Sequence, residues 1–192
     1  HVAVYEIIVN KGVNHSETIL PAIDEACRMS RVTITDVDLF ACTTGPGSFT
    51  GLRIGVSTLK GLMIATGKPA AGVSSLDALA LNVTAREKII GAMMDAGRGQ
   101  VDLAFYQYES DGSLRRLTEI KTIDPHHVLN QYSKDVIYVG EGAIQYSLVL
   151  RSLKKESDVL APDAKQYICA SAVGKLAMEK YSRNDLLDLK TC

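Results

Sequence analysis

The residues best suited to chemistry form a glycine-rich loop between a predicted buried strand and a long apolar helix. The loop comprises Thr44-Gly45-Pro46-Gly47-Ser48-Phe49-Thr50-Gly51. A strand that ends in such a loop and leads into a helix can direct backbone N–H groups toward an anion. Gly45, Gly47, Ser48 and Thr50 are therefore candidates for an anion or nucleotide loop, in vestigial form.

The known phosphate motifs do not fit this loop. A P-loop requires Gly-Lys-Ser/Thr, which is absent, and a dinucleotide loop requires Gly where Thr50 stands. The alternative is a tight packing turn, in which glycine is needed for a positive φ. Both interpretations stay open at this point.

Two further sites repeat the pattern of a strand followed by a turn. Asp95 ends an apolar strand, where α/β proteins often place a catalytic carboxylate, and Gly140-Glu141-Gly142 could approach an adenosine. No second carboxylate lies near Asp95 in the sequence, so an acid–base pair is not expected. Because there is also no GxSxG motif and no cysteine with a neighbouring histidine, we predict no catalytic residue.

The histidines and cysteines do not have metal-ligand spacing. A helical HxxxH pair with His15 would need histidine where Lys11 and Ile19 stand. The four cysteines, at positions 27, 42, 169 and 192, form no CxxC pair. We therefore predict no metal site and a reducing, cytoplasmic environment.

Composition limits the class of protein. The chain has 192 residues, is 46% hydrophobic and carries a net charge of −1. This composition excludes global disorder and gives no basic excess with which to hold nucleic acid unaided. No apolar run reaches the roughly 18 residues of a membrane span, and no secretory leader is visible. Because the first residue is His1, we expect that the chain lacks its natural start.

The elements that would position these residues suggest an α/β protein made of two similar halves. Each half contains extended strands, a helix, a strand that ends in a glycine-rich turn, and another helix. The first half is predicted to include a strand over 2–9, a helix over 16–29, a strand over 38–43 and a helix over 51–65. A β-meander over 88–123, a strand over 135–139 and helices over 143–153 and 164–181 are predicted in the second. The predicted lobes are 1–84 and 85–192.

The helix over 51–65 is apolar on nearly all sides and contains Gly51, Gly55 and Gly61. Each interior glycine costs roughly 1 kcal/mol relative to alanine, and a helix keeps glycines where another backbone approaches closely. We therefore expect one face to lie on the sheet and another to contact a partner.

Read together, Cys42 to Gly55 strongly resembles the signature GPGSFTGLRIG of the bacterial TsaB family, also called YeaZ. Similar segments are His15-Ser16-Glu17 through Pro21, Gly72 to Leu76, Asp95-Ala96 with Gly99, and Gly140-Glu141-Gly142. The resemblance covers about residues 1 to 150. It implies the actin/hexokinase-like (ASKHA) fold in degenerate form, with duplicated ribonuclease-H-like lobes. It also implies a first lobe that lacks its initial strands, since the family's Asp-Thr/Ser strand is not recognisable.

The resemblance implies a role in making threonylcarbamoyladenosine next to the anticodon of tRNAs that read codons starting with A. In that family the paralogue TsaD carries out the transfer, TsaB is its non-catalytic partner, and the ATPase TsaE joins them. TsaD-like proteins carry a metal-binding HxxxH, whereas Lys11 stands four residues before His15 here. The alternative is an active ATP- or metal-dependent transferase or peptidase of the same superfamily.

We therefore expect a subunit that binds TsaD and TsaE, meets tRNA only within the complex and forms a homodimer when alone. No cofactor is expected, with ATP present only as part of a complex, and no membrane contact is expected. The helices over 16–29 and 51–65 should form the partner interface. Its predicted residues are His15, Glu17, Ile19, Ile23, Gly51, Leu52, Gly55, Leu59 and Leu62.

Overall fold

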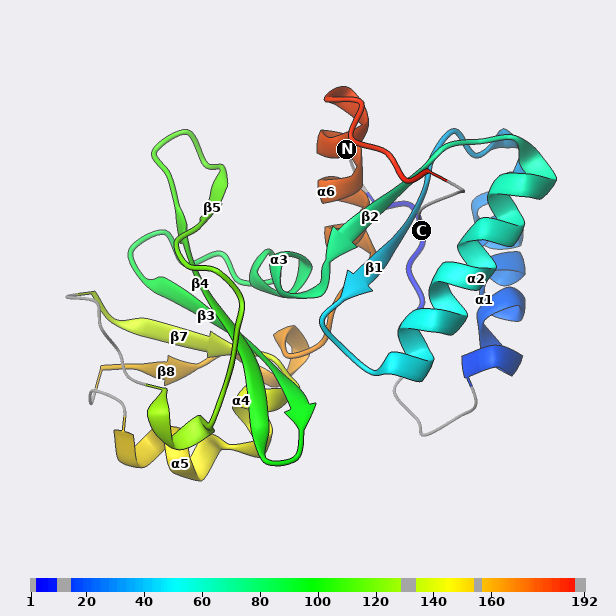
Figure 1. Cartoon of the computed structure of the whole chain (residues 1–192). Helices are drawn as coiled ribbons and strands as arrows, with labels where there is room; N and C mark the ends of the chain where they lie inside the picture. Colours follow the sequence, from blue (N-terminus) through cyan, green and yellow to red (C-terminus); the bar gives the residue numbers. More distant parts are fainter. Residues whose placement is uncertain (1–2, 10–14, 129–133, 154–156, 189–192) are drawn as a thin grey trace. The chain divides into compact units, whose positions relative to one another are not determined.

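The computed structural model describes residues 3–9, 15–128, 134–153 and 157–188, which form two compact units (Figure 1). The first unit combines residues 1–74 with 169–192, and the second contains 75–168. These units differ from the predicted lobes, 1–84 and 85–192, in two places. The helix after Ser74 packs with the second unit, and the C-terminal helix returns to the first.

A parallel pair of strands forms the centre of the first unit. Strand β1 (Phe40–Gly45) pairs with β2 (Ala70–Ser74), and helix α2 (Phe49–Thr66) connects them. Phe40, Leu59, Met63 and Ala70 pack together between this pair and α2. Helix α1 (His15–Ser30) packs beside α2. The predicted helices over 16–29 and 51–65 and the predicted strand over 38–43 are confirmed, with ends that differ by a few residues, whereas β2 was not predicted.

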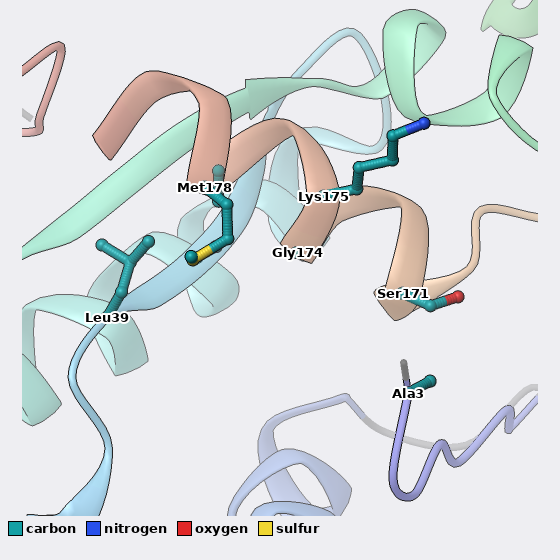
Figure 2. A pocket seen from close by; sticks show the side chains of 8 residues that line it. Ala3, Leu39, Ser171, Gly174, Lys175 and Met178 are labelled. Carbon is teal, nitrogen blue, oxygen red and sulfur yellow. The ribbon is translucent and has the colours of Figure 1, made fainter. Parts of the chain in front are cut away.

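Helix α6 (Ala170–Ser182) also packs on β1 and β2. Successive side chains of a strand point to opposite faces of the sheet. Phe40 belongs to the cluster with α2, while Leu39 and Ala41 line a groove together with α6 (Figure 2). The strand pair of the first unit is therefore covered by helices on both faces, as parallel strands require.

The strand predicted over 2–9 is wrong for its described residues, because 3–9 have no regular secondary structure. Val4 and Ile8 are exposed, and Glu6 accepts a hydrogen bond of 2.7 Å from the backbone N–H of Ser171 at the start of α6. Strand propensity is expressed only where a neighbouring strand is available for pairing. No described strand pairs with this segment.

The second unit contains a sheet of six strands among its described residues. Its centre is the hairpin of β3 (Ile89–Gly97) and β4 (Gln100–Tyr108), as the meander predicted. Two short strands, β5 (Leu114–Arg116) and β6 (Lys121–Ile123), pair with β4. Both lie within the meander predicted over 88–123, and they are separated where the Thr118 hydroxyl, instead of a carbonyl, accepts the Phe105 N–H at 3.1 Å. Strands β7 (Val136–Val139) and β8 (Val159–Leu160) extend the sheet in parallel from β3.

Helices cover both faces of this sheet. Alternate residues of β3 belong to two separate apolar clusters, Ile90 and Ala92 to one, Ile89 and Met93 to the other. Helix α3 (Ser75–Ala80) contributes Leu76 and Leu79 to the first cluster. The second cluster receives Ala143 from α4 (Glu141–Gln145) and Leu150 from α5 (Ser147–Leu153), which replace the single helix predicted over 143–153. No described helix is long and apolar enough to cross a membrane.

Candidate functional site

The glycine-rich loop turns β1 into α2. The Gly45–Pro46 peptide is cis, and Gly45 and Gly47 have φ values of +127° and +153°, where L side chains are strained. The Ser48 hydroxyl accepts a hydrogen bond of 3.3 Å from the Gly51 N–H, which makes Ser48 the N-cap of α2. Thr50 is exposed in the first turn. Local geometry therefore accounts for the two glycines and for Ser48, as the packing interpretation expects.

The second predicted turn, in the second unit, is filled by protein atoms. A Cβ on Gly140 would lie 2.1 Å from the Met93 carbonyl oxygen, and one on Gly142 would lie 2.9 Å from the Met94 carbonyl carbon. The Gly140 N–H donates to the Gln166 side-chain oxygen at 2.6 Å. The backbone of β3 thus occupies the space that these glycines open. The close packing of α4 on β3 therefore explains why both positions are glycine.

Asp95 lies near a carboxylate that the sequence analysis missed. The Asp95 carboxylate accepts a hydrogen bond of 3.1 Å from the Gly97 N–H. Burial, and then the negative charge of Asp95, raise the pKa of Glu141 above its ordinary value. The expectation that no second carboxylate lies near Asp95 is therefore wrong, because the fold brings β3 and the start of α4 together.

This pair of carboxylates does not fit a nucleotide phosphate. Two like charges repel an anion, and the Gly140 N–H already has an acceptor. Among the described residues, no three His, Cys, Asp or Glu side chains are grouped so that they could hold a metal ion.

The predicted partner interface lies on the helix pair α1 and α2. Helix α1 begins at His15, whose side chain lies outside what the structure describes. Glu17 is exposed, whereas Leu59 is buried in the core with Met63, one turn further on. Leu59 therefore faces the sheet and not a partner. The remaining predicted residues are half-buried, namely Ile19, Ile23, Gly51, Leu52, Gly55 and Leu62.

The two helices leave hollows and apolar side chains uncovered. One hollow of about 330 Å³ is lined by Ile19, Ala22, Ile54 and Gly55, together with Ile7 and Val9 of the irregular segment. A second, of about 410 Å³, lies beside Ile23, Cys27 and Leu62. A Cβ added to Gly55 or Gly61 would meet no atom within 4 Å.

Four exposed large apolar residues of these helices, among them Met29 of α1, are absent from the predicted interface. Leu20 on α1 is 55% exposed, and Phe49 and Ile64 on α2 are each 73% exposed. The Arg53 guanidinium lies 5.3 Å from the centre of the Phe49 ring. The apolar character of α2 on nearly all sides was the available signal, since a single sheet can cover only one side of a helix.

Comparison with known proteins gives two groups of relatives, named tRNA threonylcarbamoyladenosine biosynthesis protein TsaB and, over about a third of the chain, tRNA N6-adenosine threonylcarbamoyltransferase. Residues 10–186 match the family model of TsaD, described as tRNA N6-adenosine threonylcarbamoyltransferase. The chain is 32% identical over 138 residues to the tRNA threonylcarbamoyladenosine biosynthesis protein TsaB of Bacillus subtilis (strain 168). It is 30% identical over 166 residues to the protein of that name from Escherichia coli (strain K12).

These alignments cover most of the chain and less of its relatives. They include 70% of the chain and 60% of the Bacillus subtilis protein, and 80% of the chain and 70% of the Escherichia coli protein. A solved structure, YeaZ from Pseudomonas aeruginosa, superposes with a TM-score of 0.79 at 24% identity, over 93% of this chain and 83% of that one. The structural likeness supports the predicted actin/ribonuclease-H-like fold. With the family model matched over most of the chain and curated relatives at about 30% identity, the chain belongs to the TsaB (YeaZ) family.

Proposed function

We propose that this chain takes part in forming threonylcarbamoyladenosine in tRNA as a non-catalytic subunit that binds the transferase TsaD. The observation that carries the proposal is the similarity to curated relatives named as tRNA threonylcarbamoyladenosine biosynthesis proteins. TsaE and tRNA would join only in the complex with TsaD. ATP would likewise belong to the complex and not to this chain alone.

The helix pair α1 and α2 is the proposed contact surface for TsaD. Exposed apolar side chains gathered on one element are typical of a protein interface. Leu20, Phe49 and Ile64 provide such side chains, and the hollows beside Gly55 and Leu62 can accept side chains from a partner. In the absence of TsaD, the same surface would join two copies of this chain.

The non-catalytic role is supported by the contacts of the predicted turns. Ser48 caps α2, Asp95 caps its own turn, and the Gly140 N–H donates to Gln166. These groups are engaged in local structure instead of being directed at a shared reacting atom. The contacts of these groups give no support to the alternative of an active transferase or peptidase.

The net charge of the chain supports the proposal that tRNA binds only within the complex with TsaD. The chain has 21 Lys and Arg against 22 Asp and Glu. Binding to nucleic acid depends on basic side chains that displace counterions from phosphates. A chain without an excess of basic residues therefore gains little binding free energy from tRNA phosphates on its own.

The proposal is tested with the purified chain and purified TsaD of the same source. Complex formation is followed by size-exclusion chromatography with light scattering. Leu20→Lys on α1 and Gly61→Leu on α2 should each weaken binding at least tenfold, because both positions are exposed. Leu148→Lys, on α5 of the second unit, is the matched control, since Leu148 is 78% exposed. Wild-type affinity in both helix variants, or equal loss in the control, would place the contact elsewhere.

Activity separates the role in modification from simple binding. TsaD should form threonylcarbamoyladenosine on tRNA with this chain and much less without it. The chain alone, given threonylcarbamoyl-adenylate and tRNA, should form none. Formation of product by the chain alone would overturn the non-catalytic role.

A further inference from the structure

The turn between β4 and β5 contains the single Asp-Gly dipeptide of the chain, Asp111-Gly112 (Figure 1). Asp111 is exposed, and the turn belongs to the second unit, which is one continuous segment of the chain. In such a dipeptide the aspartate carboxyl carbon can be attacked by the next backbone nitrogen, and glycine hinders this attack least because it has no Cβ. The sequence of this turn is therefore suited to spontaneous rearrangement of the backbone.

The rearrangement proceeds through a five-membered succinimide ring. The Gly112 nitrogen loses its proton and bonds to the carboxyl carbon of Asp111, while the hydroxyl of the protonated carboxyl group leaves with that proton as water. A second water then breaks the bond between this nitrogen and the Asp111 backbone carbonyl carbon, which gives isoaspartate, or breaks the new bond, which restores aspartate. Isoaspartate has the same atoms as aspartate, so no oxidant or other co-reactant is needed, and the main chain now runs through the Asp111 side chain.

The folded turn holds the carboxyl group in its unreactive form. One oxygen of Asp111 accepts the Ser113 hydroxyl at 2.7 Å and the Ser113 backbone N–H at 2.8 Å. These hydrogen bonds, with the hydroxyl as the larger cause, lower the pKa of Asp111 below its ordinary value. The rearrangement requires the protonated group, because its hydroxyl is what leaves. Ser113 therefore opposes the first step.

The attacking nitrogen is also held in place. The Gly112 N–H donates to the Glu109 carbonyl at 3.0 Å, and the Glu109 N–H donates to the Ser113 carbonyl at 2.9 Å, which closes the turn. The Glu109 side chain pairs with Arg115 across the hairpin. Gly112 has φ of +83°, and a Cβ there would lie 3.2 Å from Nη2 of Arg86. Attack on the carboxyl carbon therefore requires Gly112 to leave the Glu109 carbonyl and the turn to open.

We propose that Asp111-Gly112 is a site of isoaspartate formation that the closed β4–β5 turn protects and that opening or unfolding of the turn exposes. Isoaspartate places one additional carbon in the main chain, so the hydrogen bonds that close the turn cannot form again in the same geometry. The turn holds β5 beside β4, and Arg116 of β5 binds Asp77 of α3 at 2.7 Å. Rearrangement should therefore loosen β5 as well as the turn.

The first test compares the full chain in its native state with the same chain in urea, both at neutral pH. Peptide mapping separates aspartate from isoaspartate at position 111, and heavy-oxygen water marks each chain that has passed through the succinimide. We expect the rate constant for isoaspartate formation to be at least tenfold lower in the native chain. Equal rates in the two states would overturn the proposal.

Two variants show whether the contacts of the turn provide the protection. Ser113→Ala removes the hydroxyl contact to Asp111, and should raise the native rate at least threefold while leaving the rate in urea nearly unchanged. Thr122→Ala is the matched control, because it removes a hydroxyl contact of 2.6 Å to Asp102 in the same unit. The control should leave the native rate at Asp111 unchanged. An unchanged rate in Ser113→Ala, or equal acceleration in the control, would overturn the role of Ser113, and the comparison in urea still tests the site if Ser113→Ala fails to fold.

The structural consequence is measured on the isoaspartyl chain after its separation from the unmodified chain. Amide exchange in β5, over Leu114 to Arg116, should become at least tenfold faster, whereas exchange in β7, over Val136 to Val139, should not change. Unchanged exchange in β5 would contradict the inference that the turn holds this strand. None of these measurements involves TsaD or the helix pair α1 and α2, so their outcome is independent of the proposed function.

Discussion

At the scale of single residues, Asp77 connects three segments of the second unit. Its carboxylate accepts the Tyr106 hydroxyl at 2.8 Å and two N–H groups of Arg116, the shorter contacts being 2.7 Å. Burial, followed by the charge of Asp77, raises the pKa of Tyr106, and the hydrogen bond to Asp77 raises that of Arg116. The carboxylate thus fixes α3 to β4 and β5.

We expect Asp77→Asn to lower the free energy of unfolding by about 1–3 kcal/mol, because a charge-assisted bidentate contact is lost at a partly buried site. Urea denaturation measures the change. The control Glu25→Gln removes an exposed pair with Arg28 on α1, and should cost less than about 1 kcal/mol. Equal losses in the two variants would show that the Asp77 network adds nothing beyond a surface pair.

The raised pKa of Glu141 predicts how the stability of the folded chain depends on pH. Its pKa in the folded chain lies above the ordinary 4.5, so the folded state binds the proton more tightly than the unfolded state. This stabilising contribution is present below pH 4.5 and is lost as the pH rises through the folded-state pKa.

Titration of the Glu141 carboxyl by NMR should show this raised pKa. In Asp95→Asn the pKa should fall only part of the way toward 4.5, because burial is the larger cause and the charge of Asp95 the smaller. An unchanged pKa in that variant would mean that the two carboxylates do not interact.

At the scale of elements, the start of α4 depends on a close approach that only glycine permits. Gly140 has φ of +119° and faces the backbone of β3. Gly99, in the β3–β4 turn, also has a positive φ, +77°, but has no neighbour within 4 Å of an added Cβ. Comparing substitutions at Gly99 and Gly140 therefore separates the cost of backbone strain, present at both positions, from the cost of a steric clash with β3, present only at Gly140.

Gly99→Ala should therefore cost about 1–2 kcal/mol of stability, the cost of placing a side chain in the left-handed region. Gly140→Ala should cost more than about 4 kcal/mol, or prevent the second unit from folding, because its Cβ overlaps the Met93 carbonyl. Thermal unfolding compares the two variants. Similar midpoints would contradict the tight packing of α4 on β3.

The sequence predicted where helices and strands lie better than it predicted which of them contact one another. Apolar periodicity and turn residues located α1, α2, β3 and β4 to within a few residues, because these signals are local. The strand predicted over 2–9 failed because its formation depends on a neighbour that no local pattern specifies. The proximity of Asp95 and Glu141 was missed for the same reason, since it arises from the pairing of β3 with β7. Leu59 was misassigned because the sequence does not show which side of an apolar helix meets the sheet.

At the scale of the whole molecule, the two units are joined by two chain crossings, at residues 74–75 and 168–169. The second unit is one continuous segment. The first unit needs both ends of the chain, because α6 and Leu187 contact the strand pair. Loss of the C-terminal segment should therefore affect the two units unequally.

A chain that ends after Ile168 should lose slow amide exchange in β2, at Ala70 to Val73, and keep it in β3, at Ile90 to Met93. The buried faces of Ala172, Val173 and Ala177 are the contacts removed from the first unit. A chain that ends after Asp188 is the control, and should keep slow exchange in both strands. Equal protection of β2 in the two truncated chains would show that α6 does not stabilise the first unit.

Because α6 belongs to the first unit, the order in which the two units can complete their folding during synthesis differs from their order along the chain. Residues 75–168 are synthesised as one block and contain every strand of their own sheet. The strand pair β1–β2 is made earlier, yet it must wait for about a hundred further residues before α6 can cover it. Domains usually complete themselves in order from the N-terminus during synthesis. Here the later unit can finish first, and one face of the β1–β2 pair stays uncovered in the nascent chain until α6 has been made.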